Sequence, residues 1–244
     1  FGIALALALV IVVRDQRAIS GTHVPPLRAR EGLRLVLANR QSWALALYGA
    51  GITGPILAFG GLWGVPFLMA KHGIDRTHAA TLTTVMLLGW GIGGPLTGWI
   101  SDRLRRRKPP LLAGSLTVMA SLLSTLYMPG LPTPVVGVLL FVHGLASGTM
   151  VLIFAAAREH NRPETAGVAV GFVNTSGIGA AAVLQPLVGA VLDSGWTGEM
   201  ANGVRVYPLE AYALACAVIP AAVCGALVAA LLIRETGCRN VHAG

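Results

Sequence analysis

Long uncharged stretches separated by short charged ones dominate the sequence. Residues 41–70, 77–101, 109–157, 165–192 and 211–233 contain no Asp, Glu, Lys or Arg. About 20 apolar residues suffice for one helix to cross a bilayer. The 49-residue stretch is too long for one helix, and the segment MPGLPTP (residues 128–134) interrupts it with three prolines and a glycine. The pattern therefore predicts six spans, at residues 42–69, 78–100, 110–128, 134–157, 166–192 and 211–233.

Composition supports an all-α membrane protein. Of the 244 residues, 55% are hydrophobic and only 11% are charged, with a mean hydropathy of +0.71. Soluble domains carry about 25% charged residues. One globule of this size has no way to bury so much apolar surface and still present a wetted exterior, so a soluble fold is excluded.

The first 13 residues, FGIALALALVIVV, are apolar but short. As a helix they extend about 20 Å, less than the bilayer core of about 30 Å. We interpret residues 1–13 as the end of a preceding transmembrane helix, so that the sequence is a fragment. The predicted organisation continues with a connecting loop at 14–40, a six-helix bundle at 41–233 and a tail at 234–244.

Lysine and arginine are distributed unequally between alternate loops. Residues 14–40, 102–109, 158–164 and the C-terminal tail together hold 15 of these basic residues, and the remaining loops hold 3. The positive-inside rule predicts that the loops with 15 are cytoplasmic in a multi-pass protein of the plasma (inner) membrane. Topology thereby explains the net charge of +8, and nucleic acid is not expected as a partner.

The connecting loop contains an amphipathic segment, LRAREGLRLVLANR (residues 27–40). A helix there places Arg30 and Arg34 on a different side from Leu33, Val36 and Leu37. Such a helix fits the anionic inner leaflet. An ordinary basic linker between two bundles fits equally well, and the sequence leaves both interpretations open.

A short pattern occurs twice. Pro95-Leu96-x-Gly98-x-x-x-Asp102 in the second span reappears as Pro186-Leu187-x-Gly189-x-x-x-Asp193 in the fifth, 91 residues later. The predicted topology places Asp102 at the cytoplasmic end and Asp193 at the outer end. The two copies therefore point in opposite directions, as an inverted repeat of three plus three helices requires.

The first copy carries a family resemblance. Gly98-x-x-x-Asp102-Arg103-x-x-Arg106-Arg107 resembles motif A of the major facilitator superfamily, although Arg105 stands where the family pattern has glycine. Residues 164–193 resemble the eleventh helix of many bacterial members, and FGGLWGVPF (residues 59–67) resembles the seventh.

The resemblance implies the C-terminal six-helix half of a secondary active transporter, with the six spans as helices seven to twelve. It also implies a latch that closes the cytoplasmic side in the outward-facing state. The basic residues of this loop also fix topology, which is the simpler interpretation. The expected gating residues are Gly94, Gly98, Asp102, Arg103, Arg106, Arg107 and Arg158. We expect Gly94 and Gly98 to allow close helix contact, and Arg158 to be the spatial partner of Asp102.

In the superfamily the first and fourth helices of each half line the substrate cavity. The expected cavity residues are Tyr48, Phe59 and Trp63 on the first span, with Ile52 and Pro55 on the same face, His143 and Ser147 on the fourth, and Asn174 and Gln185 on the fifth. Intramembrane ionisable groups are usually functional, but His143 is equally well interpreted as a neutral packing residue. Helix–helix hydrogen bonding is the alternative role for Asn174 and Gln185.

The sequence contains no motif that indicates an enzyme. The sequence has no Walker A motif, no Ser-His-Asp or His-Glu-x-x-His arrangement, and no disulfide or metal spacing among its three cysteines. We expect no cofactor and no metal. The expected partners are a small organic solute, the N-terminal six-helix half, the bilayer and, for ion-driven transport, a coupling proton or ion. A transporter-like sensor and a non-transporting scaffold are the rival hypotheses.

Overall fold

The computed structural model describes residues 29–201 and 203–242. Within this range, six helical segments are long and apolar enough to cross a membrane. They are Arg40–His72, Arg76–Leu104, Lys108–Tyr127, Thr133–His160, Pro163–Ser194 and Leu209–Leu232. The six predicted spans are thereby confirmed. The interpretation of residues 1–13 and the first half of the loop at 14–40 fall outside the described residues.

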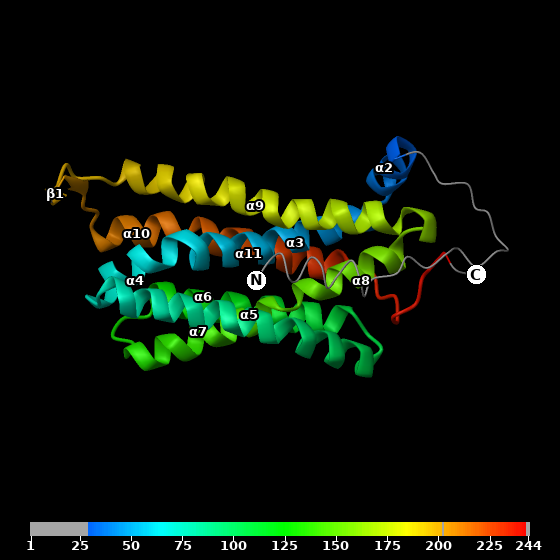
Figure 1. The fold of residues 1–244 in the computed structure, drawn as a ribbon, viewed down its shortest axis with the longest axis horizontal. Coiled ribbons are helices and arrows are strands. Elements are labelled where there is room, and N and C mark those ends of the chain that lie inside the picture. Colours follow the sequence, from blue (N-terminus) through cyan, green and yellow to red (C-terminus); the bar gives the residue numbers. More distant parts are fainter. Residues whose placement is uncertain (1–28, 202, 243–244) are drawn as a thin grey trace, which may run out of the picture.

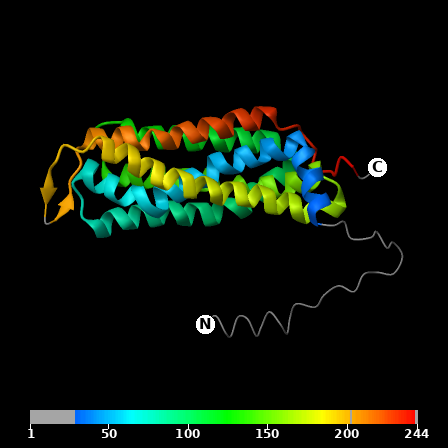
Figure 2. The same cartoon turned by 90° about the horizontal axis from the view of Figure 1, so that it is seen from above.

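The spans run side by side along one axis (Figures 1 and 2). The elements in chain order are α2 (Ala29–Ala38), α3 (Arg40–Ala58), η1 (Phe59–Trp63), α4 (Gly64–His72), α5 (Arg76–Leu104), α6 (Lys108–Tyr127), α7 (Thr133–Ser147), α8 (Met150–His160), η2 (Pro163–Thr165), α9 (Ala166–Ser194), β1 (Met200–Ala201), β2 (Val204–Arg205), α10 (Leu209–Cys216) and α11 (Val218–Leu232). Strands β1 and β2 form a short antiparallel hairpin between α9 and α10.

The first span changes its helical form near its middle. Residues Phe59–Trp63 form one turn of π-helix between α3 and α4. Pro66 has no N–H to donate to the carbonyl of Leu62, and its ring crowds that carbonyl, so the regular ladder is disturbed at this turn. By contrast, Pro55 lies inside α3 without ending it. The irregularity of the first span is therefore confined to the turn that precedes Pro66.

Glycines bring α5 and α7 into close contact, but they are not the predicted ones. A methyl group added to Gly93 or Gly144 would overlap backbone atoms of the facing helix, as would one added to Gly148, which follows α7. Gly98 has nothing within 4 Å of such a methyl group, and Gly94 meets only the side chain of Val151. The prediction is therefore corrected for Gly98 alone: Gly94 is buried in close contact with α8, and the α5 face that meets α7 carries Gly93.

The inverted orientation of the repeat is visible in the bundle. Asp102 ends α5 at the end that also holds α2, the α8–α9 connection and residues 234–242; we call this the basic end. Asp193 lies at the other end of α9, next to the β1–β2 hairpin, which we call the hairpin end (Figure 1). The two copies of the pattern thus finish at opposite ends.

Candidate functional site

The basic end begins with a tight turn after α5. Arg105 adopts the left-handed conformation, with φ 50° and ψ 37°. Its N–H donates to the carbonyl of Asp102, and the N–H of Arg106 donates to the carbonyl of Ser101, both at 3.2 Å. This pair of bonds is the Schellman motif that ends many helices. The turn is therefore formed although arginine replaces the glycine that this position favours.

The turn directs Arg107 back over the end of α5. Its guanidinium donates to Asp102 Oδ1 at 2.7 Å and to Ser101 Oγ at 3.0 Å. On its other side it contacts Glu159 of α8, with Nη2 2.7 Å and Nε 3.1 Å from Oε1. The side chains of Arg107 and Glu159 are only 9% and 11% exposed. Charged hydrogen bonds of this kind are the strong ones, and they offset part of the cost of burying both charges.

Burial alone would lower the pKa of Arg107, but its hydrogen bonds to Glu159 and Asp102 outweigh that effect and raise this pKa above the ordinary value. The guanidinium therefore stays charged at any physiological pH. Glu159 has a third donor, because the hydroxyl of Thr236 lies 2.5 Å from its Oε2. The tail thus completes the coordination of the buried carboxylate.

Glu235 of the tail caps the start of α6. Its carboxylate accepts from the backbone N–H of Arg107 at 2.8 Å and of Lys108 at 2.9 Å. The next two residues, Pro109 and Pro110, have no N–H, so these two donors are the ones that need a partner. Burial raises the pKa of Glu235, but four backbone N–H bonds outweigh it and lower that pKa below its ordinary value.

The rest of the tail follows the end of α8. Asn240 donates to the carbonyls of Arg158 and Asn161, at 2.7 and 3.1 Å. The N–H of Val241 donates to the carbonyl of Glu159 at 2.9 Å. We call residues 234–242 the tail strap, because they join α6, α8 and the α8–α9 connection at the basic end.

The structure separates the predicted gating residues. Arg107 and Asp102 are joined, whereas the Arg103 guanidinium lies over the ring of Trp99 at 5.5 Å. Arg106 and Arg158 are exposed, and neither forms an ion pair within the described residues. The expected pairing of Arg158 with Asp102 is wrong, since neighbouring residues on a helix lie about 100° apart and the inward direction belongs to Glu159. Sequence reasoning missed Glu159, whose signal was a carboxylate at the end of an apolar span.

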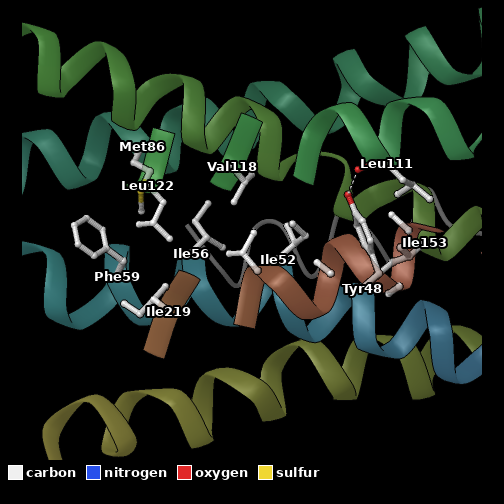
Figure 3. Packing of buried hydrophobic residues seen from close by; sticks show 14 of the residues in the cluster. Tyr48, Ile52, Ile56, Phe59, Met86, Leu111, Val118, Leu122, Ile153 and Ile219 are labelled. Atoms are coloured by element: carbon white, nitrogen blue, oxygen red, sulfur yellow. Dashed lines mark hydrogen bonds between the residues drawn. The ribbon is translucent and has the colours of Figure 1, made fainter. Parts of the chain in front are cut away.

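The predicted cavity face of the first span lies in the core of the bundle. Tyr48, Ile52 and Phe59 are fully buried among side chains of α6, α8 and α11 (Figure 3). The Tyr48 hydroxyl donates to the carbonyl of Leu111 at 3.0 Å and lies 2.8 Å from Thr149 Oγ1. The prediction that Tyr48 and Phe59 line an open cavity is corrected: α3 is the central helix, so this face packs on its neighbours.

His143 and Ser147 of the fourth span are buried too. Ser147 donates to the carbonyl of His143 at 2.8 Å. His143 Nδ1 lies 3.4 Å from Ser121 Oγ, and its Nε2 has no partner within the described residues. These contacts favour the packing interpretation of His143 within this bundle.

Trp63, Gln185 and Asn174 remain near the bundle surface. Trp63 Nε1 donates to the carbonyl of Gln185 at 2.9 Å, and Gln185 Nε2 donates to the carbonyl of Leu57 at 3.2 Å. These bonds tie α9 to the π-helical turn. Asn174 is exposed and makes no side-chain bond within the described residues. It lies 11 residues from Gln185, so the two share one edge of α9.

The architecture and composition define a multi-pass integral membrane protein. The family model described as Major Facilitator Superfamily matches the chain over residues 1–186 and again over 42–239. The chain belongs to this superfamily, which is a transporter family and not a family of enzymes.

Two curated proteins illustrate the similarity. The chain is 29% identical over 199 residues to the gentisate transporter of Corynebacterium glutamicum, a match covering 78% of the chain and 43% of the transporter. It is 33% identical over 141 residues to the membrane sensor protein UhpC of Escherichia coli, covering 56% and 32% respectively. The chain therefore spans less than half the length of these relatives.

Solved structures agree on the fold. The transporter FucP in its outward conformation matches with a TM-score of 0.67 at 18% identity, covering 96% of this chain and 52% of FucP. The inward-open xylose transporter XylE from Escherichia coli matches with a TM-score of 0.64 at 14% identity, covering 80% and 48%.

Proposed function

We propose that the chain is the C-terminal six-helix half of a secondary active transporter that moves a small organic solute by alternating access. In this proposal the basic end faces the cytoplasm of a cell whose inner membrane holds the protein. A basic connecting segment precedes the first of six spans, which is the arrangement expected of the second half. The solute path lies between this half and an N-terminal half of the same protein.

The observation that carries the proposal is the cluster at the basic end. Its inner part, Arg107 with Glu159, is buried and fixed by the tail strap. Its outer part is available: the Asp102 side chain is 69% exposed, and its Oδ2 accepts no hydrogen bond within the described residues. An exposed carboxylate that is held by a buried arginine and keeps one oxygen open to a further donor suits a contact that forms in one conformation and breaks in the other. We propose that Asp102 latches the cytoplasmic side in the outward-facing state.

The edge of α9 that holds Asn174 and Gln185 is the proposed solute-facing edge of this half. Phe172 on the other side of α9 meets Trp43 of α3. The two polar side chains therefore point away from that contact. The Gln185 side chain is held by α3, whereas Asn174 is free to bind a solute. Gentisate, from the relative's name, is the first solute to test.

The described spans carry their carboxylates only near the ends, at Asp102, Glu159, Glu164, Asp193 and Glu210. We therefore propose that a coupling group for proton or ion symport lies in the N-terminal half. His143 is the rival group within this chain. A His143→Gln variant whose transport keeps its pH dependence supports the first assignment, and a variant that loses this dependence supports His143.

The sensor hypothesis is the second candidate, because UhpC is named a membrane sensor. Reconstitution of the full-length protein in vesicles preloaded with gentisate and other small organic acids separates the two. A transporter accumulates labelled solute by counterflow, and a sensor binds it without movement. The matched variants are Asn174→Ala on the proposed edge and Val183→Ala on the exposed far side of α9. Equal effects of the two would contradict the assigned edge.

A further inference from the structure

Helix α2 is folded onto the bundle by one side only. Gly32 and Val36 are buried, and Gly32 faces the side chain of Val168 on α9. Leu33 and Leu37 remain 43% and 37% exposed. The sequence suggested that the three apolar residues share one role. The structure instead assigns Val36 to the protein contact and leaves the two leucines uncovered.

The uncovered leucines continue the outer surface of the spans. Trp43 of α3 donates from its indole N–H to the carbonyl of Leu37 at 2.8 Å, which joins the last turn of α2 to the first turn of α3. Trp43 is itself 54% exposed, and Leu47, one turn further, lies beside Gly225 of α11. This surface therefore runs between α9 and α11, away from α5 and α7. Tryptophan is enriched at the level of the lipid headgroups.

The orientation of α2 also suits a position among the lipid headgroups. In Figures 1 and 2 it runs across the end of the bundle, whereas the spans run along it. A helix that lies across the spans at their end lies along the membrane surface. An amphipathic helix in this plane binds through buried apolar area together with attraction to anionic lipids.

Two arginines border the exposed leucines, so the expectation that they lie on a different side of the helix is corrected: residues three apart on a helix share a face. Arg30 and Arg34 are one helical turn apart, both exposed, and neither forms an ion pair in the part of the chain that the structure describes. Arg40, the first residue of α3, is exposed as well. Guanidinium groups bind phosphate through paired N–H donors. The exposed leucines can contact acyl chains, and the arginines beside them can bind phosphate. An anionic phospholipid offers both groups in one molecule.

We infer that α2, with Trp43, is a binding surface for anionic phospholipid headgroups at the basic end of the bundle. The inference requires only that the spans cross a membrane, so it stands apart from the proposed transport activity. Asn39 after α2 donates to the carbonyl of His160 at 2.7 Å, which ties this surface to the end of α8.

The test measures which lipids surround Trp43. The full-length protein is placed in nanodiscs that contain the same fraction of brominated phosphatidylglycerol or brominated phosphatidylcholine, and quenching of Trp43 is taken as the difference from a Trp43→Phe variant. We expect the anionic lipid to quench more strongly, with a preference of about thirtyfold in apparent affinity for two arginines near the surface. Added salt should reduce the preference.

The double variant R30Q/R34Q should abolish this preference and keep the quenching by phosphatidylcholine. The matched control is R158Q/R162Q, which removes two exposed arginines from the same end and should keep the preference. Equal quenching by both lipids in the unmodified protein overturns the inference. So does an equal loss in the control, which assigns the effect to the overall charge. Absence of quenching by either lipid shows that protein covers α2, and likewise overturns it.

Discussion

Arg107 and Glu159 are 52 residues apart in the sequence, yet two nitrogens of the guanidinium contact Oε1 of the carboxylate, at 2.7 and 3.1 Å. The contact links the α5–α6 turn to the end of α8. Both side chains are nearly buried, so each charge depends on the other for its stability.

Replacing the carboxylate tests this dependence. We expect Glu159→Gln to destabilise the protein by about 2 kcal/mol, because Arg107 keeps Asp102 but loses its buried anionic partner. Arg158→Gln is the matched control, since it changes the exposed neighbour on the same helix turn. Thermal unfolding in detergent measures both. Equal destabilisation by the two variants would contradict the assigned partner.

Asp102 should behave differently from Glu159. Its side chain is 69% exposed, and exposed ion pairs contribute only about 0–1 kcal/mol. We expect Asp102→Asn in the full-length protein to reduce transport strongly while thermal stability and membrane abundance stay near the original. Uptake in cells, normalised to surface amount, provides the measurement. Unchanged uptake would end the proposed latch role.

The cap of α6 makes stability depend on pH. Hydrogen bonds from backbone N–H groups outweigh burial and lower the pKa of Glu235 below 4.5 in the folded protein. Its contribution is therefore complete above the unfolded value and is lost as the pH falls through the folded value. We expect Glu235→Gln to lower the melting temperature at pH 7 and at pH 6 equally, with the gap closing below about pH 4.5.

The control for this titration is Glu164→Gln, whose carboxylate makes no hydrogen bond within the described residues. At pH 7 and at pH 6 its melting temperature should equal that of the unmodified protein. A Glu235→Gln gap that persists unchanged in acid would show that the carboxylate charge is not what caps α6.

The α5–α7 contact tolerates no added side chain. A methyl group on Gly144 would overlap the backbone carbonyl of Met86. We expect Gly144→Ala to destabilise the bundle by about 1–3 kcal/mol, as overpacking does. Gly98→Ala places its methyl group in open space and should leave the melting temperature unchanged. Comparable losses of stability in both variants would mean that the flexibility of glycine in the helix, and not the α5–α7 contact, determines the effect.

The turn after α5 offers a stabilising change. Arg105 has φ 50°, a left-handed conformation that costs roughly 1–2 kcal/mol for a residue with a side chain. Arg105→Gly should therefore raise the free energy of unfolding by about 0.5–1 kcal/mol. This figure allows for the larger conformational entropy that glycine loses on folding. Arg106→Gly removes the same charge at a residue without positive φ and should not stabilise. Chemical denaturation distinguishes the two.

The sequence by itself determined the number of spans, their limits to within about four residues and the proline break at residues 128–134. It determined them because a bilayer requires long uncharged helices, and because proline ends a helix locally. The superfamily, the direction of the repeat and the basic end were also readable, since each depends on the order of residues along the chain.

Only the tertiary structure decided which face of each helix meets a neighbour. All faces of a membrane helix are apolar, so periodicity did not reveal that Tyr48 and Phe59 point into the bundle and that Gly93 replaces Gly98 at the contact. The choice of Glu159 over Arg158 and the tail strap depend on residues brought together from distant segments. Burial of opposite charges at the end of the bundle is decided by packing, which the order of residues alone does not specify.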